Sequence, residues 1–184
     1  MIGKIREYFR KMKGTTRGSP PRVSNSEMFW SWIGAFLGIA SVAGASSLLF
    51  DGLDRSLMIG SFGASAVLVY GAVRSPLAQP RNLLGGHIVL AVIGVACWKL
   101  MGQHLWLAEA MAVATAIAAM HATRTLHPPG GATALIAVIG SPAIHTLGFW
   151  YVLLPATIGP IILLVIGLLV NNIPSSRRYP EIWF

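Results

Sequence analysis

Residues 29–50 read FWSWIGAFLGIASVAGASSLLF and contain no charged side chain. A helix of these 22 residues is long enough to cross a hydrocarbon core of about 30 Å. Trp30 and Trp32 stand at its start, where aromatic rings anchor a span at the membrane interface. Further apolar runs cover 57–73, 83–98, 105–120, 130–140 and 147–170, and of these only 105–120 carries a charge, at Glu109. The sequence therefore predicts an all-α polytopic membrane protein.

The composition excludes two other classes of protein. Only 11% of the 184 residues are charged, whereas a soluble domain carries about 25%. The net charge of +8 is typical of nucleic-acid binders, but seven of the 14 Lys and Arg residues precede Val23 and the others lie mainly in connections and at the end. This distribution is the pattern of membrane topology, so we expect a lipid bilayer and no nucleic acid as partner.

The basic residues also predict the orientation of the spans. If the N-terminus is cytoplasmic and all six apolar segments cross, every arginine beyond Arg22 except one falls on the cytoplasmic side. These arginines are Arg74, Arg81, Arg124, Arg177 and Arg178, and the exception is Arg55. The positive-inside rule then places both termini in the cytoplasm, and we expect a multi-pass protein of a bacterial inner membrane.

Three regions are expected along the chain. Residues 1–27 form a basic tail, in which Ile2, Ile5, Phe9 and Met12 have the spacing of an amphipathic helix that lies on an anionic membrane. A disordered basic tail is the alternative, and residues 14–27 have the composition of a linker. The transmembrane domain covers 28–173, and 174–184 form a short cytoplasmic tail.

The transmembrane domain contains a predicted internal repeat. The string at 63–68, GASAVL, matches GATALI at 131–136, and each is followed by Ser-Pro, at Ser75 and at Ser141. The halves are about 28–101 and 104–173. Three segments separate equivalent positions, and three is odd, so the halves would have opposite orientations in an inverted 3+3 repeat.

The middle segment of each half is short. Phe62–Val73 and Gly130–Gly140 would be helices of about 18 Å and 16 Å, close to half a bilayer, beside four full spans. We expect two half-helices whose N-termini meet near the membrane midplane, where free N–H groups and helix dipoles bind an anion. The expected binding residues are Ser61, Gly63, Ser65, His127, Gly130, Gly131 and Thr133.

Three strings in order resemble the HPP family of integral membrane proteins. They are HPPGGATA at 127–134, SPLAQPRN at 75–82 and GGH at 85–87, and the RRYP string at 177–180 fits as well. The resemblance covers about 27–180. It implies four spanning helices, and, because photosynthetic members are associated with nitrite transport, it implies nitrite as the substrate.

Several of these residues have alternative interpretations. His127 either donates to the anion or moves a proton, or alternatively it caps or hydrogen-bonds a loop. Five residues are candidates for a pathway or cytoplasmic mouth: Arg81, Asn82, His87, His121 and Arg124. Topology signalling explains the arginines equally well, turn formation explains Asn82, and interfacial packing explains the two histidines.

The sequence thus favours a channel or carrier for a small monovalent inorganic anion. A membrane enzyme with a histidine-bound metal is the weaker alternative, since His87, His121 and His127 lack metal-binding spacing and no carboxylate accompanies them. A structural or assembly protein is the other alternative, and it leaves the paired helix breaks unexplained. We expect no enzymatic activity, no metal or other cofactor, and a homo-oligomer formed through glycine-rich faces.

Overall fold

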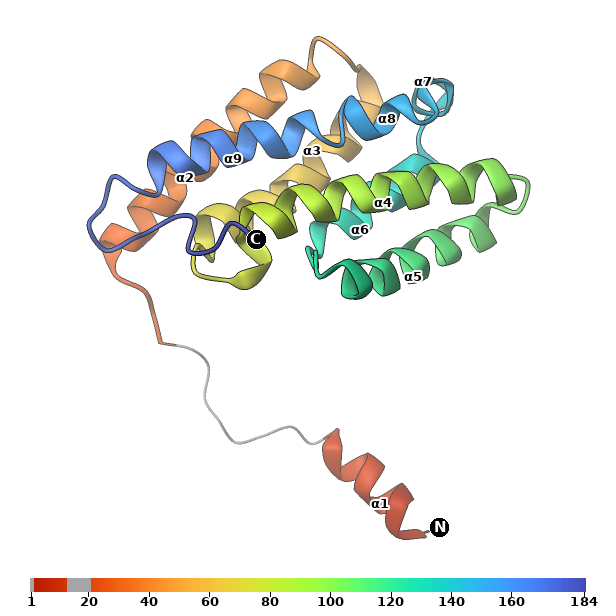
Figure 1. Cartoon of the computed structure of the whole chain (residues 1–184), viewed down its shortest axis with the longest axis horizontal. Coiled ribbons are helices and arrows are strands. Elements are labelled where there is room, and N and C mark those ends of the chain that lie inside the picture. Colours follow the sequence, from red (N-terminus) through yellow and green to blue (C-terminus); the bar gives the residue numbers. More distant parts are fainter. Residues whose placement is uncertain (1, 13–20) are drawn as a thin grey trace.

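The computed structural model describes residues 2–12 and 21–184, whose regular elements are helices and which contain no strand (Figure 1). The α-helices are α1 Ile2–Lys11, α2 Asn25–Ser46, α3 Gly52–Ala66, α4 Pro80–Met101, α5 Leu105–Thr123, α6 Pro129–Ile139, α7 Pro142–Leu147, α8 Trp150–Leu153 and α9 Ile158–Val170. A π-helical segment η1, Val67–Gly71, continues α3, and a short 3-10 helix η2, Pro76–Ala78, precedes α4. Part of the linker predicted at 14–27 lies outside the described residues.

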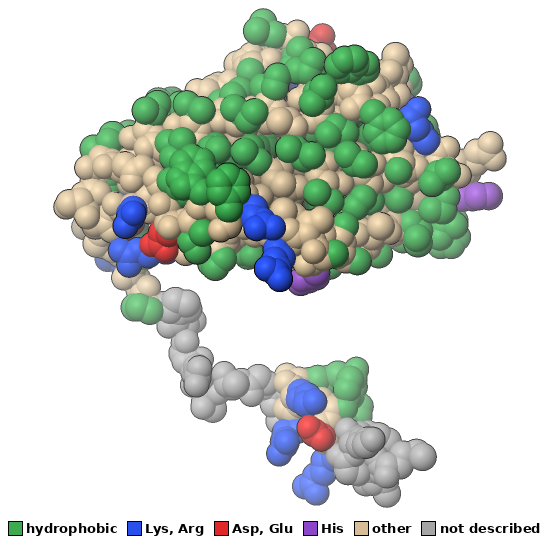
Figure 2. All heavy atoms as spheres, in the orientation of Figure 1, with side chains coloured by type: hydrophobic (Ala, Val, Ile, Leu, Met, Phe, Trp, Pro, Cys, Tyr) green, Lys and Arg blue, Asp and Glu red, His purple; other side chains and the backbone are tan. Residues whose placement is uncertain are grey.

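Among the described residues, four stretches are long and apolar enough to cross a membrane: α2, α4, α5 and the α8–α9 stretch Trp150–Val170. Large apolar side chains on them face outward, among them Trp32 at 62% exposure and Trp106 at 72%. Figure 2 shows hydrophobic side chains spread over one face of the helical body, with few charged side chains among them. A soluble protein rarely leaves so much apolar surface uncovered, and the chain is a multi-pass membrane protein.

The last span is broken, although its sequence is uncharged throughout. Its helices end at Leu153 and restart at Ile158, and Leu147 belongs to α7 rather than to the span. Pro155 lies in the break and has no N–H to continue the helical hydrogen bonds. The Thr157 hydroxyl donates to the Val152 carbonyl at 2.6 Å, so a side chain satisfies one of the carbonyls that the break exposes.

The prediction of a first half-helix at Phe62–Val73 is wrong. The helix starts at Gly52 instead of Phe62 and runs through η1 to Gly71. Gly60 and Gly63 lower helix propensity by about 1 kcal/mol each, but they keep their N–H groups and therefore do not break the helix. The second short helix is present: α6 has 11 residues and is about 16 Å long.

The helices form two groups that meet at the centre of the bundle. In one group α4, α5 and α6 contact each other pairwise, and in the other α2, α3 and α9 do so. Contacts of α3 with α6 and of α4 with α9 join the two groups. Residues of α3, α4 and α6 therefore share one interior region. One cluster of buried apolar side chains lies within α4, α5 and α6, and the other joins α2, α3 and α9 to α4 and α6.

Glycines set the distance between α4 and the start of α6. A Cβ on Gly86 would lie 2.6 Å from the His127 Cβ, and one on Gly130 would lie 3.2 Å from the Gly86 carbonyl carbon. Side chains at both positions would push the two backbones apart. This close approach brings His87, the residue after Gly86, against the start of α6.

The two Ser-Pro pairs of the predicted repeat have the same local structure. The Ser75 hydroxyl accepts the Leu77 N–H at 3.2 Å where η2 begins, and the Ser141 hydroxyl accepts the Ala143 N–H at 3.1 Å where α7 begins. Each serine caps a short helix whose first residue is proline. The inverted arrangement of the two halves stays a prediction.

Candidate functional site

Five polar side chains meet at the junction of the two helix groups. They are Ser61 and Ser65 of α3, His87 of α4, Thr133 of α6, and His127 just before α6. Each is at most 1% exposed. We call them the polar centre. Polar groups removed from water in a membrane protein are costly, so their concentration here marks the strongest candidate for a functional site.

Hydrogen bonds connect all five residues in one chain. Ser61 contacts Thr133 at 2.8 Å, and Thr133 contacts His87 Nδ1 at 2.7 Å. His87 Nε2 lies 2.8 Å from the Ser65 hydroxyl, which lies 2.9 Å from His127 Nε2. Across the described residues, no buried side-chain nitrogen or oxygen lacks a partner. The polar centre is therefore internally satisfied.

Local helix geometry explains why these residues meet. Ser61 and Ser65 are four residues apart, so they lie on the same face of α3. Phe62 packs against the His87 ring, with the ring centroids 5.7 Å apart. The two imidazole rings are 5.1 Å apart, because Gly86 lets α4 approach the start of α6.

The sequence predicts four of these five residues as neighbours and predicts a different place for the fifth, His87. His87 was expected at a cytoplasmic mouth, but it is fully buried and bonded on both ring nitrogens. Gly63 and Gly131 were expected to contact the substrate. Both are partly exposed, and a Cβ added to either would meet nothing within 4 Å.

The predicted pair of opposed helix N-termini is not formed. Ser61 and Ser65 lie within α3, well past its first turn at Gly52. At the start of α6, the Gly130 N–H donates to the His127 carbonyl and the Gly131 N–H to the Pro128 carbonyl, both at 2.9 Å. The donors at the centre are thus hydroxyls and imidazoles rather than free backbone N–H groups.

Two further buried polar residues were missed. Tyr151 of α8 is buried, and its hydroxyl donates to the Thr133 carbonyl at 2.9 Å. Asp54, in the first turn of α3, is only 5% exposed and accepts hydrogen bonds from the N–H and hydroxyl of Ser141. In the sequence Tyr151 resembles an interfacial aromatic residue and Asp54 a loop charge, so neither gave a signal.

A pocket of about 280 Å³ is lined by three of the predicted mouth residues, Arg81, Asn82 and Arg124, among others. Arg81 donates to the Thr123 carbonyl at 3.1 Å, and the Asn82 amide donates to the Leu126 carbonyl at 2.9 Å. These bonds tie the start of α4 to the segment that leads to His127. His121, by contrast, is exposed on α5 and does not line this pocket.

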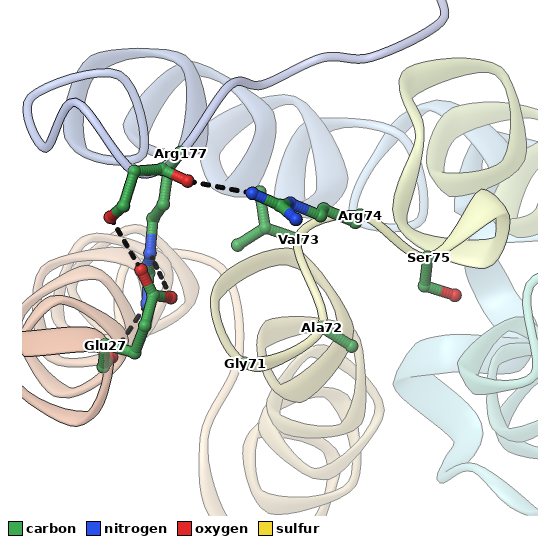
Figure 3. Close-up of a pocket in the computed structure, with 8 residues that line it drawn as sticks. Glu27, Gly71, Ala72, Val73, Arg74, Ser75 and Arg177 are labelled. Carbon is green, nitrogen blue, oxygen red and sulfur yellow. Dashed lines mark hydrogen bonds and ion pairs between the residues drawn. The ribbon is translucent and has the colours of Figure 1, made fainter. Parts of the chain in front are cut away.

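A second pocket, of about 450 Å³, surrounds a buried arginine (Figure 3). Arg177 is 8% exposed and pairs with Glu27 of α2 at 2.8 Å. It also donates to the Tyr70 carbonyl at the end of η1 and to the Asn171 side chain. The RRYP string indicated this residue only as part of a motif, whereas the structure makes it a bridge between the C-terminal tail and two helices.

Beyond Arg177, the C-terminal segment also contacts the region around η2. Tyr179 is 2% exposed, and its hydroxyl donates to the Ala78 carbonyl at 2.8 Å. Burial raises the pKa of Tyr179, so the phenol stays protonated and keeps donating. This bond fixes the carbonyl next to Leu77, the residue whose own carbonyl contacts His127 Nδ1 at 2.8 Å.

Comparisons with known proteins cover nearly the whole chain. A family profile described as the transmembrane region of HPP proteins matches residues 20–180. One transmembrane protein of Dictyostelium discoideum is 43% identical over an alignment of 182 residues, which covers 97% of this chain and 58% of that protein. Another from the same organism is 39% identical over 184 residues, 98% of this chain and 64% of its own length. The chain thus spans about three fifths of these relatives. No solved structure shows significant similarity.

Proposed function

The chain belongs to the HPP transmembrane family, and we propose that it moves a small monovalent anion across the membrane, with nitrite as the first substrate to test. The observation that carries this proposal is the polar centre. Hydroxyls and imidazoles without any carboxylate gather inside a bundle whose outer surface is apolar. Neutral donors of this kind suit an anion, whereas a cation path in a membrane usually needs acidic side chains.

In the proposed mechanism the anion binds next to His127, at the start of α6. The α6 dipole is favourable for negative charge there. Every hydroxyl proton of the polar centre already has an acceptor, so the anion must replace one of these hydrogen bonds. Such an exchange costs about 1 kcal/mol per bond, and a charge-assisted bond to the anion returns more than that.

The basic pocket at Arg81, Asn82 and Arg124 is the proposed mouth. Two guanidinium groups raise the local concentration of anions near the segment that leads to His127. Asn82 is bonded to the Leu126 carbonyl, one residue before His127, so occupancy of the pocket is coupled to the position of that histidine. Neither this pocket nor the pocket around Arg177 is lined by residues of the polar centre, so transport requires this segment to move.

The same feature supports a second candidate function. A closed, fully bonded centre is also what a structural or assembly protein needs to hold its helices in one arrangement. In that case the polar centre specifies the fold and no anion enters it. Flux measurements separate the two functions.

The proposal includes the expectations on topology and partners. Both termini lie on the cytoplasmic side, the two halves form an inverted repeat, and α1, which exposes Tyr8 and Phe9, lies on the membrane surface. The protein assembles as a homo-oligomer, is not an enzyme, and needs neither a cofactor nor nucleic acid. A bacterial inner membrane remains our proposed location.

Flux into proteoliposomes tests the function. Purified wild type is compared with His127→Ala, Thr133→Val and, as the matched control, His121→Ala on the exposed face of α5. We expect nitrite flux above empty liposomes in wild type and in the control, and a loss of at least about tenfold in the other two, equivalent to about 1.4 kcal/mol. Absence of flux for nitrite, nitrate, formate and chloride in folded wild type would reject transport in favour of the structural role.

A further inference from the structure

The hydrogen bonds of the polar centre have a fixed direction. His127 Nδ1 lies 2.8 Å from the Leu77 carbonyl, which can only accept, so Nδ1 carries the proton. Neutral His127 then has an unprotonated Nε2, and the Ser65 hydroxyl at 2.9 Å donates to it. The Ser61 carbonyl is a second acceptor for Ser65 but lies farther away, at 3.4 Å. We therefore assign the Ser65 proton to the shorter bond, to His127 Nε2, which also leaves no buried imidazole nitrogen unpaired.

The direction continues through His87. Because Ser65 has one proton and gives it to His127, the contact with His87 Nε2 requires His87 to be the donor. Nδ1 of neutral His87 is then the acceptor, and the Thr133 hydroxyl donates to it. The Ser61 hydroxyl in turn donates to Thr133. All five donors therefore point the same way, from Ser61 toward the Leu77 carbonyl.

A second arrangement with one more proton is also fully bonded. In it His127 is protonated on both nitrogens and Nε2 donates to Ser65, which donates to His87 Nε2. His87 carries its proton on Nδ1 and donates to Thr133, which donates to Ser61. The Ser61 hydroxyl then needs an acceptor, and the Pro129 carbonyl is available at 3.2 Å. The same atoms thus accommodate two proton arrangements without any change of side-chain position.

We propose that Ser61, Thr133, His87, Ser65 and His127 form a proton relay that delivers one proton to His127 at the anion site, so that anion transport is proton-coupled. The relay rests on the function proposed above for the purpose of the delivered proton, but not for its existence. An imidazolium beside the anion neutralises its charge inside the bilayer. One proton moving with one monovalent anion makes the cycle electroneutral.

One proton enters the relay and one proton leaves it in each cycle. A proton from water binds the Ser61 hydroxyl, whose own proton moves to Thr133. The Thr133 proton moves to His87 Nδ1, the His87 Nε2 proton moves to Ser65, and the Ser65 proton moves to His127 Nε2. His127 is then an imidazolium and later releases its Nδ1 proton to water near Leu77. Rotation of the hydroxyls and return of both rings to their first tautomers restore the starting arrangement.

The groups that contact the two histidines are uncharged, so the imidazoles themselves hold the charge of the added proton. Tyr151 of α8 donates to the Thr133 carbonyl, Tyr179 of the tail donates to the Ala78 carbonyl, and α5 contributes the Met120 sulfur, which accepts the His127 N–H. Asp54 of α3 is bonded to Ser141, at the opposite end of α6 from His127. Within the described residues, no carboxylate, lysine or arginine bonds to either imidazole.

The relay makes a prediction that needs no transport. When His127 gains a proton, His87 must change from the Nε2–H to the Nδ1–H tautomer. We would record ¹⁵N NMR spectra of histidine-labelled protein in lipid bilayers between about pH 8 and pH 4. Signals are assigned with His87→Asn and His127→Asn, and His104→Gln and His121→Gln remove two exposed rings. We expect one transition in which both histidines change together.

Substitution of Ser65 distinguishes a proton-transfer role of its hydroxyl from a purely structural one. In Ser65→Ala the two imidazoles lose their link, so His127 should titrate while His87 keeps its tautomer. Ser65→Thr retains the hydroxyl and should restore the joint transition. A His87 that keeps one tautomer throughout the wild-type titration, or starts in the Nδ1–H form at high pH, would overturn the relay.

Coupled flux distinguishes failure of the relay from failure of the function. In wild-type proteoliposomes we expect about one proton per nitrite and a flux independent of an imposed voltage. In Ser65→Ala the proton-to-nitrite ratio should fall toward zero, and the remaining flux should become voltage-dependent. Nitrite flux without proton movement in wild type rejects the relay and keeps the transport function. The joint tautomer change without any anion flux keeps the relay and rejects the transport function.

Discussion

The strings GASA at 63–66 in α3 and GATA at 131–134 in α6 have the same pattern of buried and exposed residues, but the two helices that contain them start at different distances from the string. In both, the glycine is partly exposed, the first alanine is exposed, and the hydroxyl residue and second alanine are buried. Ser65 and Thr133 occupy equivalent positions and bind the two different nitrogens of one ring, His87. Yet α3 starts 11 residues before its string and α6 only two. Local pattern determines which face is buried, and proline determines where a helix can start.

The largest expected effect comes from giving α3 the helix breaker that α6 has. Gly60→Pro removes a backbone donor within α3 and adds a ring that clashes with the preceding turn, at a cost of about 3 kcal/mol or more. We expect little folded protein, measured as the monodisperse fraction in detergent and by thermal unfolding. Gly60→Ala is the matched control and should be as stable as wild type or slightly more so. A stable proline variant would show that α3 tolerates a break as α6 does.

The next effect tests whether the two equivalent hydroxyls are energetically equivalent. Thr133→Val leaves one buried imidazole nitrogen without its partner and Ser65→Ala leaves two. We expect each substitution to lower the free energy of unfolding by about 1–3 kcal/mol. Thr133→Ser and Ser65→Thr keep the hydroxyl and should recover most of the loss. Combining each hydroxyl deletion with His87→Leu should be less than additive, since the histidine is the shared partner. Additive losses would mean that the two hydroxyls contribute independently of His87.

The sequence could predict much of the fold because its signals are local. Long apolar runs with at most one charge indicated the four spans, and Pro128 and Pro129 indicated the short α6. The first half-helix was wrong because a glycine only weakens a helix, whereas a proline ends one. The break before α9 was missed although Pro155 stands in it, since the apolar run continues through it without a charge.

The site was predictable only as far as local strings reach. Ser65, Thr133 and His127 were expected together because they belong to matched or distinctive strings, and Ser61 because it lies two residues before one of them. His87 joins them through the close approach of Gly86 to His127, which no spacing along the chain reveals. Tyr151 and Arg177 act through backbone carbonyls of distant elements, Thr133 and Tyr70, and carbonyl partners leave no mark in a sequence.

The smallest expected effect concerns the two glycines that open the matched strings. Gly63 and Gly131 have helical backbones with no positive φ, and a Cβ at either position meets nothing within 4 Å. Ala at each position should therefore leave stability unchanged or raise it by up to about 1 kcal/mol through helix propensity, as a thermal shift in detergent would measure. In a homo-oligomer that packs through these faces, the same substitutions should weaken association instead. Mass measurement of Gly63→Ala and Gly131→Ala in detergent thus decides whether the open glycines face lipid or a second copy of the chain, and a change at only one of them would end the equivalence of the two strings.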